Sequence, residues 1–161
     1  MRYYPVAIKL DKKCAVVIGG GRVAERKVLG LLRSGAHITV VSPKITAALA
    51  GLEGERLKWN KRLARKSDLI GADIVIAATN VSRVNRNVSR WAEARRVLCN
   101  VVDKPRLGNF IAPAVLRKGK AILAVYTDGK DPVLSRDLKN FLKEHWNDFL
   151  RYRNRLQKNA D

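Results

Sequence analysis

The sequence predicts an α/β fold, in which a doubly wound parallel sheet is followed by a small β-hairpin and a long helix. Short apolar runs alternate with helix-periodic segments as far as Asp103, which is typical of a parallel sheet with right-handed crossovers. A glycine-rich loop joins an apolar run to the first helix, as in Rossmann-type sheets. After Asp103, two strand-like runs follow one another without a helix between them, which indicates a hairpin. We therefore expect a Rossmann-type domain over residues 1–103 and a hairpin-and-helix region over residues 104–161.

Each element has its own signal in the chain. Apolar runs, continuous or alternating, predict strands over residues 6–10, 14–18, 37–42, 57–59, 73–79, 97–102, 110–116 and 121–126. Apolar residues at helical spacing predict helices over residues 23–34, 45–52, 81–92 and 131–155. Gly35 suits the end of the first helix, and Asn80 or Ser82 can cap the third. Asp131 with Pro132 suits the start of the last.

The amino-acid composition excludes several classes of protein. A chain of 161 residues with 47% hydrophobic residues can build one domain with a small appendage. Its net charge of +19 attracts anions, whether nucleic acid, an acidic membrane or a polycarboxylate ligand. No apolar run approaches the ~18 residues of a membrane span, and two cysteines and two histidines cannot build a Cys-rich zinc module. We expect no metal site, and we expect Cys14 and Cys99 to be buried, reduced thiols of a cytoplasmic protein.

The sharpest local motif is Gly-Gly-Gly-Arg-Val-Ala at residues 19–24, which fits G-x-G-x-x-A between a strand and a helix. Gly19 permits a tight turn, Gly21 lets a pyrophosphate approach the backbone, and Ala24 lets the helix pack closely on the sheet. The free N–H groups at the helix start then face the phosphates. This context indicates a dinucleotide site, and the alternative is a plain glycine-rich connection.

The end of the second strand leaves the cofactor type open. An NAD site usually carries Asp or Glu there to hold the ribose hydroxyls, whereas this chain has Ser42, Pro43 and Lys44. Ser42 can donate one hydrogen bond, and Lys44 can favour the additional phosphate of NADP. The spacing alone therefore does not choose between NAD and NADP.

Two further residues are expected at the carboxyl edge of the sheet. Thr79 ends a strong strand and should point at the cofactor, because ligands of doubly wound sheets lie at that edge. Asp103 follows the strand over residues 97–102 and should lie at the same edge as the glycine loop. A carboxylate there can act as a general base, and the alternative is a turn-forming Asp before Pro105.

Basic residues gather in two places. Arg83, Arg86 and Arg90 share one helix face, and six basic residues with no acid lie within residues 56–66. Both sets are either solvated surface or a means of binding an anion with several charges. Only Trp59 supplies an aromatic ring for stacking on bases in the second set, and familiar nucleic-acid motifs are absent from the sequence. Nucleic-acid binding through the basic surface therefore ranks last.

Several segments together resemble one family, the precorrin-2 dehydrogenases of siroheme biosynthesis, also found as the N-terminal part of siroheme synthases. The matching segments are residues 17–27, 35–43, 77–80 with 84–85, 99–105, 109–113 and 131–136. The glycine loop alone is unspecific. Combined with Asn-Val-Val-Asp at residues 100–103 and Phe-Ile-Ala-Pro at residues 110–113, it is much more specific.

The resemblance implies NAD-dependent oxidation of precorrin-2 to sirohydrochlorin by a homodimer whose hairpin and following helix form the subunit contact. It implies that Asp103 removes the proton. The residues implied around NAD are Gly19, Gly21, Arg22, Val23, Pro43 and Lys44. Precorrin-2 carries acetate and propionate groups, which a basic cleft can hold. The residues expected to bind this substrate are Arg83, Arg86, Asn109 and Thr127.

Two readings of the function stay open beside this one. Some members of the family also insert ferrous iron, and the sequence does not decide whether this chain does. Asp128 and Asp131 stand where the family usually has a glycine and a serine. These replacements favour the alternative of a non-catalytic NAD-binding regulator or partner subunit.

Overall fold

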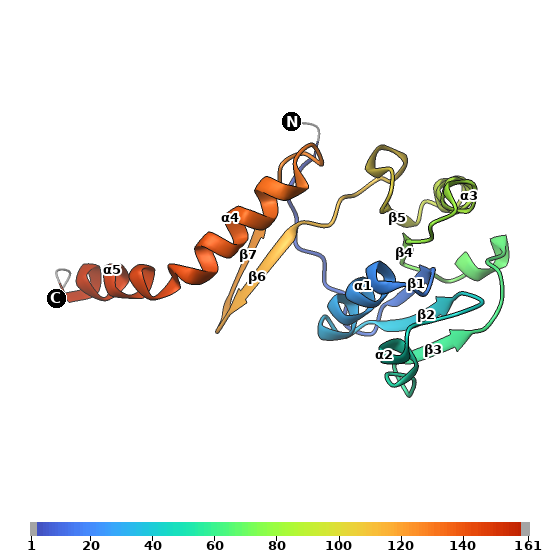
Figure 1. Ribbon diagram of the computed structural model, residues 1–161, viewed down its shortest axis with the longest axis horizontal. Coiled ribbons are helices and arrows are strands. Elements are labelled where there is room, and N and C mark those ends of the chain that lie inside the picture. Colours follow the sequence, from blue (N-terminus) through green and yellow to red (C-terminus); the bar gives the residue numbers. More distant parts are fainter. Residues whose placement is uncertain (1–2, 159–161) are drawn as a thin grey trace. The chain divides into compact units, whose positions relative to one another are not determined.

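The computed structural model describes residues 3–158, which form two compact units (Figure 1). One unit comprises residues 4–111, and the other comprises Tyr3 with residues 112–158. The first unit runs on to Ile111, beyond the division expected after Asp103. The reason is that the backbone N–H groups of Asn109 and Phe110 both donate to the Cys99 carbonyl, at 3.0 and 3.4 Å.

The first unit is built on a five-stranded sheet in the order β3-β2-β1-β4-β5. All four pairings are parallel, and the chain builds outward from β1 in both directions. This doubly wound order confirms the predicted fold class. The strands are β1 (Cys14–Ile18), β2 (His37–Val41), β3 (Leu57–Asn60), β4 (Ile74–Ala77) and β5 (Leu98–Val101).

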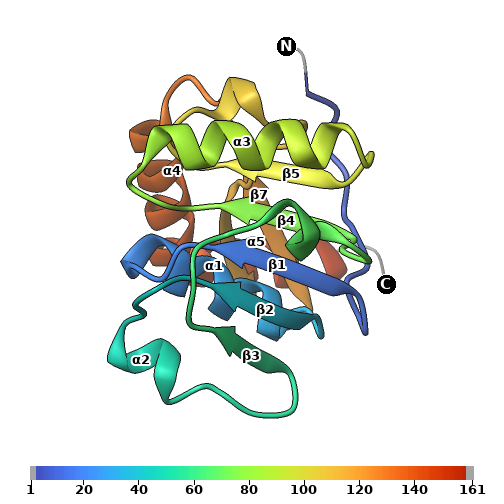
Figure 2. The same cartoon turned by 90° about the vertical axis from the view of Figure 1, so that its right-hand side faces the viewer.

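Two helices cover opposite faces of this sheet (Figure 2). α1 (Arg22–Arg33) packs on the face that Ala15 and Val17 of β1 present, and α3 (Ser82–Glu93) packs on the face of Val16 and Ile18. Burial on both faces explains why β1 is a continuous apolar run rather than an alternating one. The smaller elements are α2 (Ala47–Ala50) and the 3-10 turns η1 (Lys66–Leu69) and η2 (Pro105–Leu107).

The second unit consists of a hairpin and two helices. β6 (Ala114–Lys118) pairs antiparallel with β7 (Ala121–Val125), as predicted. α4 (Pro132–Glu144) begins with Asp131, whose Oδ1 accepts the N–H of Leu134 at 2.8 Å. α5 (Trp146–Lys158) follows. Within the described part of the chain, no helix is both long and apolar enough to cross a membrane.

Several local expectations were wrong. Residues 6–10 form no strand. The last helix is not continuous, because His145 leaves the helical conformation, stacks its ring on Phe141 at 4.1 Å and ends α4. Neither Asn80 nor Ser82 caps α3: Val81 holds that position and makes no side-chain cap. Cys14 is exposed at the start of its strand, whereas Cys99 is buried.

Candidate active site

The three glycines of the first loop have different surroundings. Gly19 has φ +119°, and a Cβ there would lie 2.5 Å from the carbonyl oxygen of Ala78. A Cβ on Gly20 would lie 2.1 Å from the carbonyl oxygen of Lys44. A Cβ on Gly21 would meet none of the described atoms within 4 Å. The first two glycines are therefore required by the fold itself, and the third leaves an open approach to the backbone.

This open approach lies at the start of α1. Gly21 is the N-cap residue, so no side chain there occupies the N–H groups of the first turn. Its carbonyl accepts the Glu25 N–H at 2.9 Å, which starts the helix, and Ala24 is fully buried beneath it. Uncapped N–H groups at the positive end of a helix fit a phosphate group. The residues present thus suit a dinucleotide pyrophosphate.

The segment after β2 is tied to the glycine loop. Ser42 is buried, and its Oγ donates to the Lys44 carbonyl at 2.7 Å. Thr46 donates its N–H to the Gly20 carbonyl at 3.0 Å and its Oγ1 to Glu25 Oε2 at 2.7 Å. The Ser42 hydroxyl hydrogen is therefore used inside the loop, and its lone pairs alone remain for a ribose hydroxyl. Lys44 is exposed.

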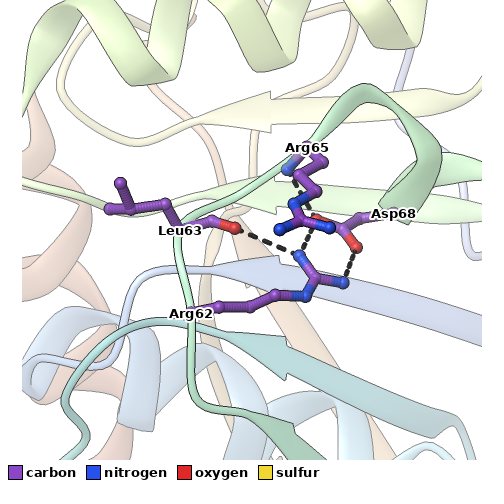
Figure 3. A network of polar contacts seen from close by, with 4 residues as sticks. All are labelled: Arg62, Leu63, Arg65 and Asp68. Carbon is purple, nitrogen blue, oxygen red and sulfur yellow. Dashed lines mark hydrogen bonds and ion pairs between the residues drawn. The ribbon is translucent and has the colours of Figure 1, made fainter.

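The basic segment between β3 and β4 is held by one carboxylate (Figure 3). Asp68 accepts a bidentate pair of hydrogen bonds from the guanidinium of Arg62 and the backbone N–H of Arg65 at 2.7 Å. Burial alone would raise the pKa of Asp68, but these hydrogen bonds and the two positive charges outweigh it and lower the pKa below 3.8. Lys61 lies 5.7 Å from the centre of the Trp59 ring. Part of the basic run therefore stabilises its own loop.

Asp103, just beyond β5, is held by two side chains of α3. Ser82 Oγ donates to Asp103 Oδ2 at 2.9 Å, and Asn85 Nδ2 donates to Asp103 Oδ1 at 2.9 Å. Asn85 is fully buried and also bonds to Thr79, whose Oγ1 donates to Asn85 Oδ1 at 2.8 Å. The carboxylate itself is exposed. An oriented, solvent-accessible carboxylate is suited to accept a proton.

The remaining predicted site residues fall into two groups. Arg22, Val23, Pro43, Arg83 and Arg86 are exposed. Asn109 and Thr127 already have partners. The Asn109 amide bonds to the backbone of Val97 and Cys99 at 3.1 and 2.7 Å, and Thr127, in the second unit, donates its Oγ1 to the Asp131 carbonyl at 2.6 Å.

The predicted site residues do not include Asn85, Ser82 and Asn100. Asn85 carried a signal, because it lies on the buried stripe of α3 with Val88 and Ala92, where a polar residue needs partners. Asn100 is 4% exposed and donates Nδ2 to the Phe110 carbonyl at 3.1 Å, but its Oδ1 has no partner within residues 3–158. No pattern in the sequence predicts this unpartnered oxygen of Asn100.

The described residues contain no group of three or more His, Cys, Asp or Glu side chains that could hold a metal ion. Asp103 supplies the carboxylate that the side chains of α3 orient at this site.

Known proteins share this sequence and fold. The family model described as "Putative NAD(P)-binding" matches residues 6–114. Siroheme synthases of Methylobacillus flagellatus and Nitrosomonas eutropha are each 41% identical over 140 and 141 residues, 86% of this chain. The solved structure of SirC, precorrin-2 dehydrogenase, matches with a TM-score of 0.78 and 30% identity, covering 89% of this chain and 71% of that one.

The chain spans 30% of the length of these siroheme synthases, but most of SirC. The NAD(P)-binding match covers the glycine loop, the end of β2 and Asp103, the three places where the geometry suits a dinucleotide and a proton acceptor. This protein accordingly belongs to the family described as "Putative NAD(P)-binding" and is related to SirC and to part of the siroheme synthases.

Proposed function

We propose that this chain catalyses the NAD-dependent oxidation of precorrin-2 to sirohydrochlorin, a step of siroheme biosynthesis. The observation that carries the proposal is the pairing of two features at one sheet edge. The uncapped start of α1 follows β1, and the oriented carboxylate of Asp103 follows β5. The two strands are separated by β4 alone, which corresponds to about 10 Å.

In this oxidation the tetrapyrrole loses one hydrogen as a hydride and one as a proton. Bound NAD+ supplies the hydride acceptor. The chain supplies the rest: Gly19 and Gly21 admit the pyrophosphate to the start of α1, with Arg22 and Val23 beside it, and Asp103 takes the proton. Thr79 holds Asn85, which in turn holds Asp103.

The segment after β2 would hold the adenosine ribose. Ser42, Pro43 and Lys44 take the place of the acid that usually holds the ribose hydroxyls, and the Ser42 hydroxyl can accept a hydrogen bond there. NAD is our proposed cofactor because the NAD(P)-binding model matches this chain and the fold matches that of a precorrin-2 dehydrogenase.

The basic surface would bind the substrate. Precorrin-2 carries several carboxylates, and the exposed guanidinium groups of Arg83 and Arg86 lie on α3, one and four residues beyond Ser82. Bidentate pairing with carboxylates suits arginine. The unpartnered Oδ1 of Asn100 can accept an N–H of a bound ligand. Because Asn109 and Thr127 already hold their own segments, we propose that each supports the backbone of its own unit and does not bind the substrate directly.

The proposal extends to the oligomeric state and the cellular location of the protein. Seven apolar side chains of α4 and α5 are between 43% and 54% exposed: Val133, Leu134, Leu138, Phe141, Phe149, Tyr152 and Leu156. A second copy of the chain would cover this face in a homodimer. We also propose a cytoplasmic location, where the free thiols Cys14 and Cys99 would stay reduced.

The test is an anaerobic assay of precorrin-2 with NAD+ and with NADP+, followed by the absorbance of the reduced nucleotide. We expect turnover with NAD+, and a fall of about 100-fold or more in Asp103→Asn, because a general base contributes that much. Glu55→Gln is the control, since Glu55 is an exposed carboxylate of a surface loop. Binding of NAD+ without any turnover of precorrin-2 would instead support the non-catalytic regulator.

A further inference from the structure

The two oxygens of the Asp103 carboxylate have partners of different kinds. Oδ1 faces the side-chain N–H of Asn85, and Oδ2 faces the hydroxyl of Ser82, each at 2.9 Å. An amide N–H can only donate a hydrogen bond, whereas a hydroxyl can donate or accept one. Protonation of Oδ1 and protonation of Oδ2 therefore have different effects on these hydrogen bonds.

The orientation of the Asn85 amide is determined by its backbone partners. Its Oδ1 accepts the backbone N–H of Thr79 at 3.2 Å, and its Nδ2 donates to the Thr79 carbonyl at 2.9 Å. A flipped amide would place donor against donor and acceptor against acceptor. Because Asn85 is fully buried, water cannot compensate for such a mismatch. The second N–H of the amide must therefore point at Asp103 Oδ1.

A proton on Oδ1 would turn that oxygen into a hydroxyl oxygen, which is a weaker acceptor for the Asn85 N–H than a carbonyl oxygen is. A proton on Oδ2 leaves Oδ1 as the carbonyl oxygen that accepts the Asn85 N–H, and the Ser82 hydroxyl can rotate to accept the new O–H. Ser82 is only partly buried, so its hydroxyl has room to turn.

We propose that Asp103 takes its proton on Oδ2, and that Ser82 and Asn85 are positioning residues which reserve that oxygen for the proton. The proposal rests on the function proposed above. In the step, a C–H bond of the tetrapyrrole breaks and an O–H bond forms at Asp103 Oδ2. The electron pair of the C–H bond stays in the macrocycle, whose oxidation is completed by loss of a hydride to NAD+. The Ser82 hydroxyl changes from donor to acceptor.

The first part of the test does not depend on enzymatic turnover. In atomic-resolution crystal structures of the whole chain, taken at acidic pH until the carboxyl is protonated, the Cγ–Oδ2 bond of Asp103 is expected to be longer than the Cγ–Oδ1 bond. Equal bonds, or a longer Cγ–Oδ1 bond, would overturn the assignment. This part decides the proposal even if precorrin-2 proves not to be the substrate.

The second part is kinetic. Ser82→Ala is expected to lower kcat by about tenfold or more while leaving the KM for precorrin-2, the NAD+ affinity and the melting temperature unchanged. Ser82→Thr keeps a hydroxyl and is expected to restore most of kcat. Asn87→Ala, on the same helix, is the control. Wild-type kcat in Ser82→Ala, or equal losses in the alanine and threonine variants, would contradict the role of the hydroxyl. An inactive wild type would reject the proposed function and leave the crystallographic part to decide the proton site.

Discussion

Gly20 and Gly21 are neighbours in one loop, yet a methyl group has very different consequences at the two positions. At Gly20 it would meet the Lys44 carbonyl oxygen at 2.1 Å and the Ile45 Cα at 2.9 Å, both of them backbone atoms that cannot turn aside. At Gly21 it would enter open space, and the backbone there (φ −84°, ψ −176°) suits any residue. Gly20 is thus required by the fold, whereas Gly21 is expected to matter for the ligand.

The pair gives a matched prediction. Gly20→Ala is expected to destabilise the protein by about 1–3 kcal/mol, as overpacking does. Gly21→Ala is expected to melt close to the wild type but to bind NAD+ about tenfold more weakly, which corresponds to about 1.4 kcal/mol. Thermal unfolding and calorimetric titration with NAD+ measure the two effects. Equal NAD+ affinity in Gly21→Ala and the wild type would mean that the pyrophosphate does not pass this residue.

Lys27 is the second residue for which we make a prediction, which concerns the dependence of stability on pH. Burial, with a smaller contribution from the charge of Arg26, lowers the pKa of Lys27 from 10.5 to about 8. The folded chain therefore binds fewer protons than the unfolded chain between pH 8 and 10.5, so this group makes stability rise with pH over that window. Below pH 8 the full penalty of the buried charge is present.

Lys27→Met removes this penalty. We expect the variant to melt higher than the wild type at pH 7 by at least about 3 °C, with a difference that shrinks as the pH rises from 8 to 10.5. Lys58→Met, at an exposed position of β3, serves as the control. Melting curves across that pH range measure both. A variant that melts below the wild type at pH 7 would show that the ammonium group has a stabilising partner.

At the scale of the element, the buried and the exposed faces of α3 have different functions. Its buried face supplies Val88 and Ala92 to the core and Asn85 to the carboxylate network. Its exposed face carries Arg83 and Arg86. One helix thus links the proton acceptor to the proposed carboxylate-binding surface, and the two faces can be changed independently because they are separated around the helix axis.

Charge reversal on the exposed face is the corresponding prediction. The double variant Arg83→Glu with Arg86→Glu is expected to raise the KM for precorrin-2 by about tenfold or more, without changing NAD+ affinity. Arg33→Glu is the control, because Arg33 ends α1 at the opposite edge of the sheet. Steady-state kinetics and NAD+ titration separate the two quantities. Equal losses of substrate and NAD+ binding would contradict the assignment of this face to the substrate.

At the scale of the whole molecule, the second unit exposes more apolar surface than its own hairpin can cover. Leu138 and Phe141 of α4 are 43% and 53% exposed, although apolar side chains on a helix normally face a core. If two copies cover these faces in a dimer, the wild type should run at about twice 18.0 kDa in light scattering.

The variant Leu138→Glu with Phe141→Glu is expected to be monomeric, because a charge in an apolar interface is strongly unfavourable. Lys143→Glu adds the same charge on the other side of α4 and should leave the dimer intact. Size-exclusion chromatography with light scattering distinguishes these outcomes. A monomeric wild type at every concentration would refute the proposed dimer.

The sequence by itself determined the parallel sheet, the glycine loop and the hairpin, because each depends on local patterns. An apolar run buried on two faces, glycines between a strand and a helix, and a turn between two strand-like runs are all read from neighbouring residues. Resemblance of separated segments added the family, which the relatives confirm. The long last helix was predicted as one piece, since its apolar stripe continues through His145, where the ring instead folds back onto Phe141.

Only the tertiary structure decided how the carboxylate of Asp103 is held. Ser82 and Asn85 precede it by 21 and 18 residues, and they meet it because β4 and β5 end side by side and α3 starts at that edge. Likewise, the requirement for glycine at position 20 comes from Lys44, which lies on the segment after β2. A pattern within one segment records which face is buried, but hydrogen bonds between segments depend on the register and packing of the strands that bring them together.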